Sequence, residues 1–195
     1  MAKVIAFPTP SPEKFGFKPA SKKKPLNSKK PGQLDLFSEA KVISLNRLSV
    51  FEEAFMLDER GDKKSKELYL KAIDQNDSLA DAYCNLGIIE SEDKNFIPAI
   101  DYFTKSLKED PRHYEAHYNL ANLYAEVGNI SLAKIHYQLS IAIEPDFPNS
   151  HFNLGITLAT NKEVALAIES LEKYKMLVSP EDQTLANELI ESLSK

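Results

Sequence analysis

The sequence predicts an all-α solenoid in which pairs of helices stack one upon the next. The first observation is that the chain matches itself at a shift of 34 residues over most of its length after residue 46. The second is that each repeat contains two apolar stripes at helical spacing, with a short polar turn between them. A helix pair of this size cannot bury its apolar face alone, so neighbouring repeats must stack.

The repeat is clearest in a short stretch that ends in glycine or alanine. Tyr83–Gly87, His117–Ala121 and His151–Gly155 align with one another at this shift. Later in each repeat an alanine recurs, followed by a large apolar residue. These pairs are Ala99 with Phe103, Ala133 with Tyr137, and Ala167 with Leu171. Small residues in both helices let the two helices of a pair approach closely.

Prolines and a capping pattern predict where the helices begin and end. Pro111 and Pro145 close two of the repeats, because the residue before a proline avoids the α region. At the other end, Ser49 and Glu52 have the spacing of a capping box that begins the first helix. A degenerate first copy of the repeat follows in register, with Tyr69 in the column of Phe103 and Tyr137.

These residues resemble the tetratricopeptide repeat family, whose unit of about 34 residues carries an aromatic residue, a Leu-Gly pair, an alanine, a second aromatic residue and a closing proline. The resemblance implies a helix-turn-helix solenoid, a right-handed superhelix whose concave face is lined by the first helix of each pair. We expect about four repeats over residues 46–180, the first of them degenerate. A C-terminal capping helix is expected over residues 181–195. Its apolar stripe consists of Leu185, Leu189, Ile190 and Leu193.

Residues 1–45 form a basic tail rich in proline, lysine and serine. We expect this tail to be disordered, because it has too little apolar surface to offset the entropy of folding. It has nine lysines against three acids, which gives a net charge of +6. The whole chain has a net charge of −5, so the remainder carries −11. Such a tail is either a solvated linker or a contact for nucleic acid and other anionic surfaces.

Nothing in the sequence favours catalysis. It contains no P-loop, no G-x-G-x-x-G, no G-x-S-x-G, no H-E-x-x-H and no C-x-x-C motif. The single cysteine, Cys84, has no fixed base near it in the sequence, and we expect a surface or half-buried thiol. His113 and His117 have helical spacing but lack a third ligand, and His117 fills a packing column of the repeat. We therefore predict a non-enzymatic protein with no cofactor and no metal.

The N-terminal residues and the cysteine content favour a cytoplasmic protein that does not enter the membrane. Pro8, Pro10 and Pro12 interrupt the apolar start of the chain before a signal peptide can form. No apolar run approaches the roughly 18 residues needed to span a bilayer. A single cysteine fits a reducing compartment.

A column of asparagines predicts a peptide-binding groove on the concave face. Asn85, Asn119 and Asn153 recur at the 34-residue shift. An asparagine amide both donates and accepts, so it can bridge a peptide bond without contacting the peptide side chain. The arrangement resembles the asparagine ladder in the repeat arm of O-linked N-acetylglucosamine transferases, whose catalytic part has no counterpart here. The flanking groove positions are expected to be Ile88, Asn122, Ile156, Cys84, Tyr118 and Phe152, with Asp81, Glu115, Glu92 and Glu126 at the rim.

The ligand implied by these positions is an extended peptide that is partly apolar and neutral to basic. The chain lacks the set of lysines and arginines by which repeat co-chaperones hold carboxylate tails. In the alternative interpretation the asparagines satisfy contacts between helices and bind no peptide. The sequence leaves both interpretations open.

A second candidate site lies in the tail. Gln33-Leu34-Asp35-Leu36-Phe37 resembles the pentapeptide by which bacterial replication and repair proteins dock on the β sliding clamp. Leu36 and Phe37 would fill an apolar pocket, and Gln33 would form a hydrogen bond at its rim. In the alternative interpretation this segment covers the exposed end of the first repeat, together with Val42, Ile43 and Leu45.

Three functions follow from these features. The repeats favour a protein-protein interaction scaffold that binds an extended peptide or a partner protein whose identity the sequence does not give. The tail motif favours a replication or repair accessory protein tethered to the β sliding clamp. The lysines of the tail favour a nucleic-acid-associated protein, but this is the weakest of the three because the acidic body repels phosphate.

Overall fold

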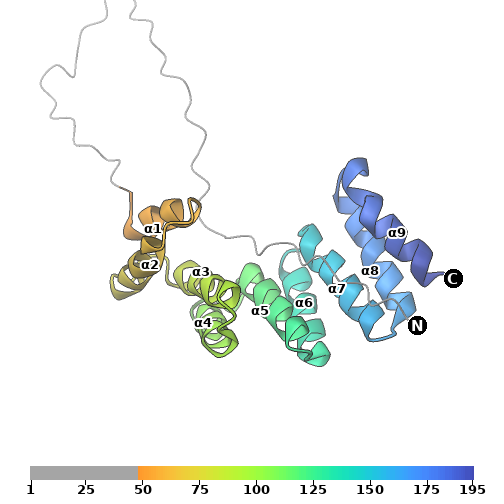
Figure 1. Cartoon of the computed structure of the whole chain (residues 1–195), viewed down its shortest axis with the longest axis horizontal. Helices are drawn as coiled ribbons and strands as arrows, with labels where there is room; N and C mark the ends of the chain where they lie inside the picture. Colours follow the sequence, from red (N-terminus) through yellow and green to blue (C-terminus); the bar gives the residue numbers. More distant parts are fainter. Residues whose placement is uncertain (1–47) are drawn as a thin grey trace, which may run out of the picture.

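The computed structural model describes residues 48–195. The whole tail, including the motif at residues 33–37, lies outside the described residues. The described residues form nine α-helices, one short 3₁₀ helix and no strand, which confirms the all-α prediction. The α-helices are α1 (Val50–Asp58), α2 (Lys64–Asp74), α3 (Leu79–Glu92), α4 (Phe96–Glu109), α5 (Tyr114–Glu126), α6 (Ile130–Ile143), α7 (Pro148–Thr160), α8 (Val164–Leu177) and α9 (Thr184–Leu193). The 3₁₀ helix, Pro180–Gln183, joins α8 to α9. Figure 1 shows the pairs following one another in chain order.

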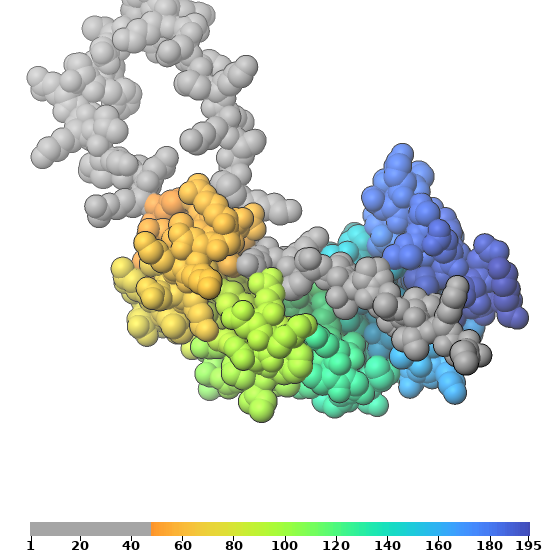
Figure 2. Space-filling model, viewed as in Figure 1, coloured from red at the N-terminus to blue at the C-terminus, as the bar shows by residue number. Residues whose placement is uncertain are grey.

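The helices form two layers. Each odd-numbered helix from α1 to α7 packs against the even-numbered helix that follows it, and each pair contacts only its neighbours. In addition α5 contacts both α3 and α7, whereas α4, α6 and α8 make no comparable contacts with one another. The layer whose members lie closer together is on the inside of the curve. The two ends of the array also stand on the same side of the middle repeats (Figure 2). We call α1, α3, α5 and α7 the inner layer, and α2, α4, α6 and α8 the outer layer.

Small residues set the distance between the two helices of a pair. A Cβ atom at Gly87 would lie 2.7 Å from the ring of Phe103, and one at Gly155 would lie 2.8 Å from Leu171. Both contacts are closer than real Cβ atoms allow, so glycine is required for these helices to cross where they do. The predicted role of these positions is therefore confirmed.

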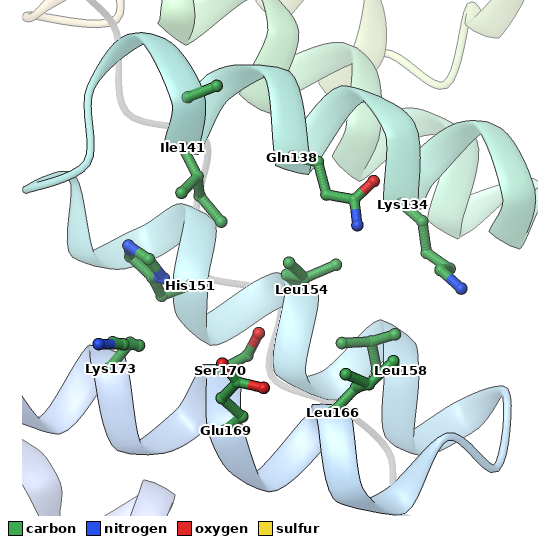
Figure 3. Close-up of a pocket in the computed structure, with 11 residues that line it drawn as sticks. Lys134, Gln138, Ile141, His151, Leu154, Leu158, Leu166, Glu169, Ser170 and Lys173 are labelled. Carbon is green, nitrogen blue, oxygen red and sulfur yellow. The ribbon is translucent and has the colours of Figure 1, made fainter.

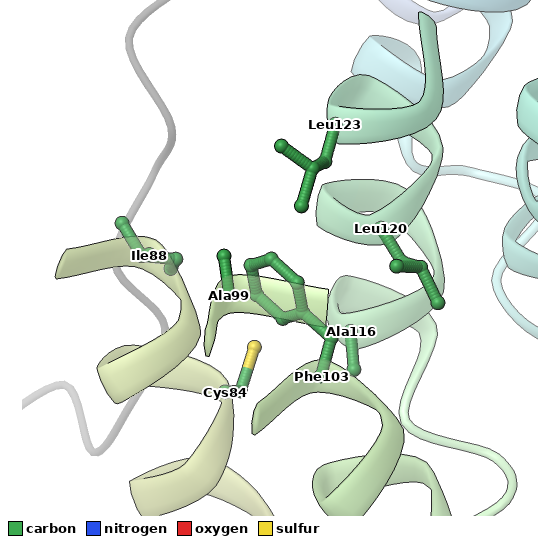
Figure 4. Packing of buried hydrophobic residues seen from close by; sticks show 7 residues of the cluster. All are labelled: Cys84, Ile88, Ala99, Phe103, Ala116, Leu120 and Leu123. Atoms are coloured by element: carbon green, nitrogen blue, oxygen red, sulfur yellow. The ribbon is translucent and has the colours of Figure 1, made fainter. Parts of the chain in front are cut away.

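The core runs continuously from one repeat to the next. Residues of α3 and α4 pack together with residues of α5, the first helix of the following pair (Figure 4). The buried members of this cluster are Cys84, Ile88, Ala99, Phe103, Ala116, Leu120 and Leu123. A pair therefore buries its apolar surface only when the next pair is present, as expected for a solenoid.

The array begins as the sequence predicts. The Ser49 hydroxyl accepts a hydrogen bond from the Glu52 N–H at 3.1 Å, and the Glu52 carboxylate accepts one from the Ser49 N–H at 2.8 Å. This is the predicted capping box. The Phe51 N–H also donates to Asp77 at 2.8 Å, which ties the start of α1 to the turn between α2 and α3.

The first helix has a charged residue at a position that is apolar in the later repeats. Ala54 lies in a buried cluster with Tyr69, just as Gly87 contacts Phe103, so Ala54 occupies the glycine position of the repeat. Glu53, one residue earlier, therefore lies in the column of the repeat leucines. Those leucines are Leu86, Leu120 and Leu154, and all three are buried, whereas Glu53 is exposed. At this position the first repeat has a carboxylate where the later repeats have a leucine, which favours exposure of this end of the array to water.

The last helix covers the opposite end. Phe152, Leu171 and Ala186 form a buried cluster against which Leu189, Ile190 and Leu193 pack. The predicted capping helix is present, but one member of its predicted stripe is not part of it, since Leu185 is 40% exposed. Ala186 takes its place because the 3₁₀ helix delays the start of α9, and positions 186, 189, 190 and 193 then share one face.

Within residues 48–195, no helix combines the length and the apolar character needed to cross a membrane.

Candidate peptide-binding surface

The inner layer is acidic over its first three helices, since α7 contains no carboxylate. Its four helices contain eight carboxylates and no lysine or arginine. Every helix of the outer layer, in contrast, contains at least one lysine. The two faces of the array therefore differ in charge, and the concave side has a negative field.

The three predicted ladder asparagines lie in the inner layer, and their amides contact the preceding repeat. The Asn85 amide donates to the Tyr69 hydroxyl at 3.1 Å. The Asn119 amide lies 3.8 Å from the Cys84 sulfur, a weak contact. Asn85 and Asn119 are 0% and 3% exposed. The positions thus recur in space as they do in sequence, but each amide has a different partner.

Asn153 has the strongest of these contacts. Its amide donates to the Tyr118 hydroxyl at 3.1 Å and to Asn122 Oδ1 at 2.8 Å. The Tyr137 hydroxyl donates to the same Asn122 oxygen at 2.6 Å. This network joins α5, α6 and α7, which supports the interpretation that Asn153 and Asn122 satisfy contacts between helices.

The acceptor oxygen of Asn119 is buried and has no hydrogen-bond partner among the described residues. A buried acceptor of this kind carries a free-energy cost in the folded protein. Since Asn119 is only 3% exposed, a peptide N–H would reach this oxygen only after neighbouring side chains moved.

The flanking positions divide into packed residues and rim residues. Ile88 is buried between α3 and α5, Phe152 packs against Tyr174 with ring centroids 4.9 Å apart, and Ile156 borders the cluster under α9. At the rim, Glu92 is exposed and Glu126 pairs with Lys94 at 2.7 Å. Peptide binding by these residues stays a prediction.

An aromatic cluster that sequence reasoning missed lies where α5 meets α7. The Phe147 ring contacts Tyr114 and Tyr118 edge to face, with centroids 5.2 Å and 5.1 Å apart. Phe147 comes immediately before α7, outside the repeat columns, so the 34-residue pattern did not reveal it. Tyr118 is the only one of the three predicted as a groove residue.

His113 links two repeats through the rim acids. It is the N-cap of α5, and in its neutral form its Nδ1 accepts a hydrogen bond from the Ala116 N–H at 3.2 Å. Its Nε2 lies 3.2 Å from Asp81, and Glu115 is also 3.2 Å away. Burial lowers the pKa of this imidazole, but the two carboxylates outweigh burial and raise the pKa to about 9. Asp81 and Glu115, predicted at the rim, therefore form part of the junction between α3 and α5.

One column of the inner layer faces the outer layer through pairs of side chains whose size decreases from the second repeat to the fourth. The pairs are Tyr83 with Tyr102, His117 with His136, and His151 with Ser170. The two tyrosine rings stack at 6.3 Å, and the Nδ1 atoms of His117 and His136 lie 3.0 Å apart. The third pair has only a serine hydroxyl on the α8 side.

A pocket of about 370 Å³ opens at this third pair, between α6, α7 and α8 (Figure 3). Ser170 stands where His136 and Tyr102 stand in earlier repeats, and Leu158 stands where Tyr124 does. The smaller side chains leave the space unfilled. Alignment of the repeat columns could have predicted this pocket, since both substitutions are visible in the sequence.

Cys84 is fully buried, so the expected surface or half-buried thiol is not found. It lies in the packing between α3 and α5, where burial raises its thiol pKa. A thiol in this position is not a nucleophile. Over the part of the chain that the structure describes, no group of three or more potential ligands gathers for a metal ion.

Comparison with known proteins supports the same fold. Two tetratricopeptide repeat family models match, at residues 80–113 and 102–134. No curated relative matches the sequence. Among solved structures, MamA superposes with a TM-score of 0.64 at 19% identity, covering 75% of this chain and 84% of that one. The MamA RS-1 ArsTM double mutant has a TM-score of 0.64 at 16% identity, covering 74% and 80%.

A third solved structure is the first tetratricopeptide domain of Spaghetti (RPAP3), bound to the HSP90 peptide SRMEEVD. It superposes with a TM-score of 0.56 at 18% identity, covering 60% of this chain and 90% of that one. Together with the helix pairs and the 34-residue repeat, these matches define a tetratricopeptide-repeat solenoid.

Proposed function

We propose that the chain is a non-enzymatic scaffold that binds an extended peptide, partly apolar and neutral to basic, along its inner layer. The observation that carries this proposal is the charge of that layer, with eight carboxylates and no lysine or arginine. Basic groups on a peptide would be attracted to this surface, and an acidic peptide would be repelled. An apolar contact would come from Ile156, which is half-buried.

The charge of the inner layer also predicts what the scaffold rejects. The peptide bound to the Spaghetti domain, SRMEEVD, ends in three acids among its last four residues. The helices of the inner layer have no lysine or arginine to pair with such acids. We therefore expect the scaffold to discriminate against a peptide of this kind.

A matched pair of peptides tests the proposal. The full chain is titrated with fluorescent SRMEEVD and with its basic analogue SRMKKVK. We expect the analogue to bind at least about tenfold tighter, an effect that weakens with salt because it is electrostatic. Equal or tighter binding of SRMEEVD would contradict the proposal.

Charge reversal on the protein provides the control. Glu92→Lys with Glu126→Lys adds positive charge to the inner layer and should weaken binding of SRMKKVK. Glu169→Lys with Glu188→Lys makes the same change in charge at exposed positions on α8 and α9, and should leave binding nearly unchanged.

The clamp-binding motif remains a second candidate function. The observation that favours it is the exposed Glu53 in the leucine column of α1, a carboxylate that needs no apolar cover. Met56 on the same helix is 37% exposed, so the alternative that residues 33–37 cover the first repeat is an outcome of the test.

The test compares the full chain with a Leu36→Ala and Phe37→Ala variant against purified β sliding clamp. Micromolar binding that the variant loses, with an unchanged melting temperature, would support clamp docking. Absence of binding, together with a lower melting temperature of the variant, would instead assign the segment to the first repeat.

A further inference from the structure

We propose that the inner layer binds the N-terminal segment of its own chain, Met1–Lys24, so that the groove is occupied in cis until another basic peptide displaces it. This inference rests on the proposed function, since it names a ligand for the same surface. The segment lies outside the described residues, so the argument uses its sequence, its charge and its point of attachment.

The segment has the charge that the inner layer lacks. Met1–Lys24 contains six lysines and a single acid, Glu13. The inner layer contains eight carboxylates and no basic residue other than histidine. An intramolecular pairing of the two neutralises part of the imbalance between a tail of +6 and a body of −11.

The segment also has the apolar groups that the surface accommodates. Phe7, Phe15 and Phe17 are its three aromatic residues. At the junction of α5 and α7, the half-buried rings of Tyr114 and Phe147 meet edge to face at 5.2 Å and offer a surface onto which such a ring packs, whereas Tyr118 is buried. Prolines on both sides of Phe15 favour the extended conformation that a groove requires.

The geometry of attachment brings the segment to this junction. The chain enters α1 at Leu48, at one end of the array. Neighbouring helices of a layer are about 10 Å apart, so α5 and α7 lie roughly 20–30 Å from that point. A random coil with as many residues as the segment from Phe17 to Leu48 has a root-mean-square length of about 30 Å. A linker whose length matches the span gives an effective concentration in the millimolar range.

This concentration makes even weak binding consequential. If the segment alone bound with a Kd of about 0.1 mM, an effective concentration of about 1 mM would fill the groove in roughly nine molecules of ten. A competing peptide would then bind about tenfold more weakly than to an empty groove. The tail would thus set a threshold for the affinity that a partner must reach.

The first arm of the test is photocrosslinking in the full chain, with p-benzoylphenylalanine in place of Phe15. Equal amounts of light and heavy-isotope protein are mixed before irradiation. Crosslinks from Phe15 to α5 or α7 within one molecule are expected, and Glu92→Lys with Glu126→Lys should reduce them. Crosslinks between light and heavy chains would assign the groove to a second copy, and no crosslink to the inner layer would also overturn the inference.

The second arm is competition with SRMKKVK as the probe. The full chain carrying Phe7→Ala, Phe15→Ala and Phe17→Ala should bind the probe about tenfold tighter than the unaltered chain. Equal affinity would overturn occupation in cis while leaving the proposed function intact. Absence of probe binding to both proteins would overturn the proposed function, and the inference with it.

Discussion

Replacement of Asn153 by alanine tests how the ladder asparagines are used. The change removes two hydrogen bonds, to Tyr118 at 3.1 Å and to Asn122 at 2.8 Å, from a side chain that is 8% exposed. A buried hydrogen bond contributes about 1 kcal/mol, so Asn153→Ala should cost about 2 kcal/mol. For an ordered array of this size, that loss lowers the melting temperature by roughly 5 °C.

Asn119→Ala is the matched control, at the equivalent position one repeat earlier. It removes only a contact of 3.8 Å with the Cys84 sulfur and eliminates a buried acceptor that has no hydrogen-bond partner. Its cost should stay below about 1 kcal/mol. Urea unfolding followed by circular dichroism measures both variants. Equal losses, or a larger loss for Asn119→Ala, would refute the assignment of Asn153 as the structural member of the column.

Three further predictions concern stability. Burial, and secondly the charge of His117, lower the pKa of His136 to about 4, and burial also lowers the pKa of His117. The imidazoles of the unfolded chain titrate near pH 6.5. The stability that is present above pH 6.5 therefore falls as the pH drops toward 4. In the unaltered chain the free energy of unfolding should fall by about 1–2 kcal/mol between pH 7 and pH 5, as measured by urea titration. The double variant His117→Tyr with His136→Tyr should abolish this fall, and an unchanged fall would show that other groups cause it. Ser49→Ala breaks the capping box and should cost about 1 kcal/mol, while a neutral effect would mean that α1 frays without consequence. Ser170→Tyr should fill the pocket and stack on His151, raising the melting temperature, and a lower value would show that the pocket cannot accept the ring.

The fold could be predicted because its determinants are periodic. Gly87 and Gly155 mark helix crossings, Pro111 and Pro145 mark ends, and Ser49 marks a beginning. Each of these signals acts within one helix or between adjacent helices. A 34-residue shift therefore reveals them without knowledge of how distant repeats are arranged.

The site could be predicted less well because its contacts join residues of different repeats. The amides of Asn119 and Asn153 each contact the residue one position before the preceding asparagine, which is Cys84 in one case and Tyr118 in the other. The asparagine column of the repeat contains three identical residues, but the hydrogen-bond partners of their amides lie in a different column of the preceding repeat. Phe147 lies in no column at all, so its cluster with the tyrosines needed the three-dimensional structure.

The gradual loss of side-chain bulk along the array, from stacked tyrosines through histidines to a serine, determines where the array opens first. In a linear stack each unit is secured only by its neighbours, so local opening starts at the junction with the fewest packing atoms. Among the second, third and fourth repeats, that junction is beside Ser170, next to the pocket. Backbone amides of α8 and α9 should exchange with deuterium as one group and ahead of those in α3, α4 and α5. The array would then unfold from its C-terminal end, and a protease would cleave α8 before it cleaved the acidic central helices.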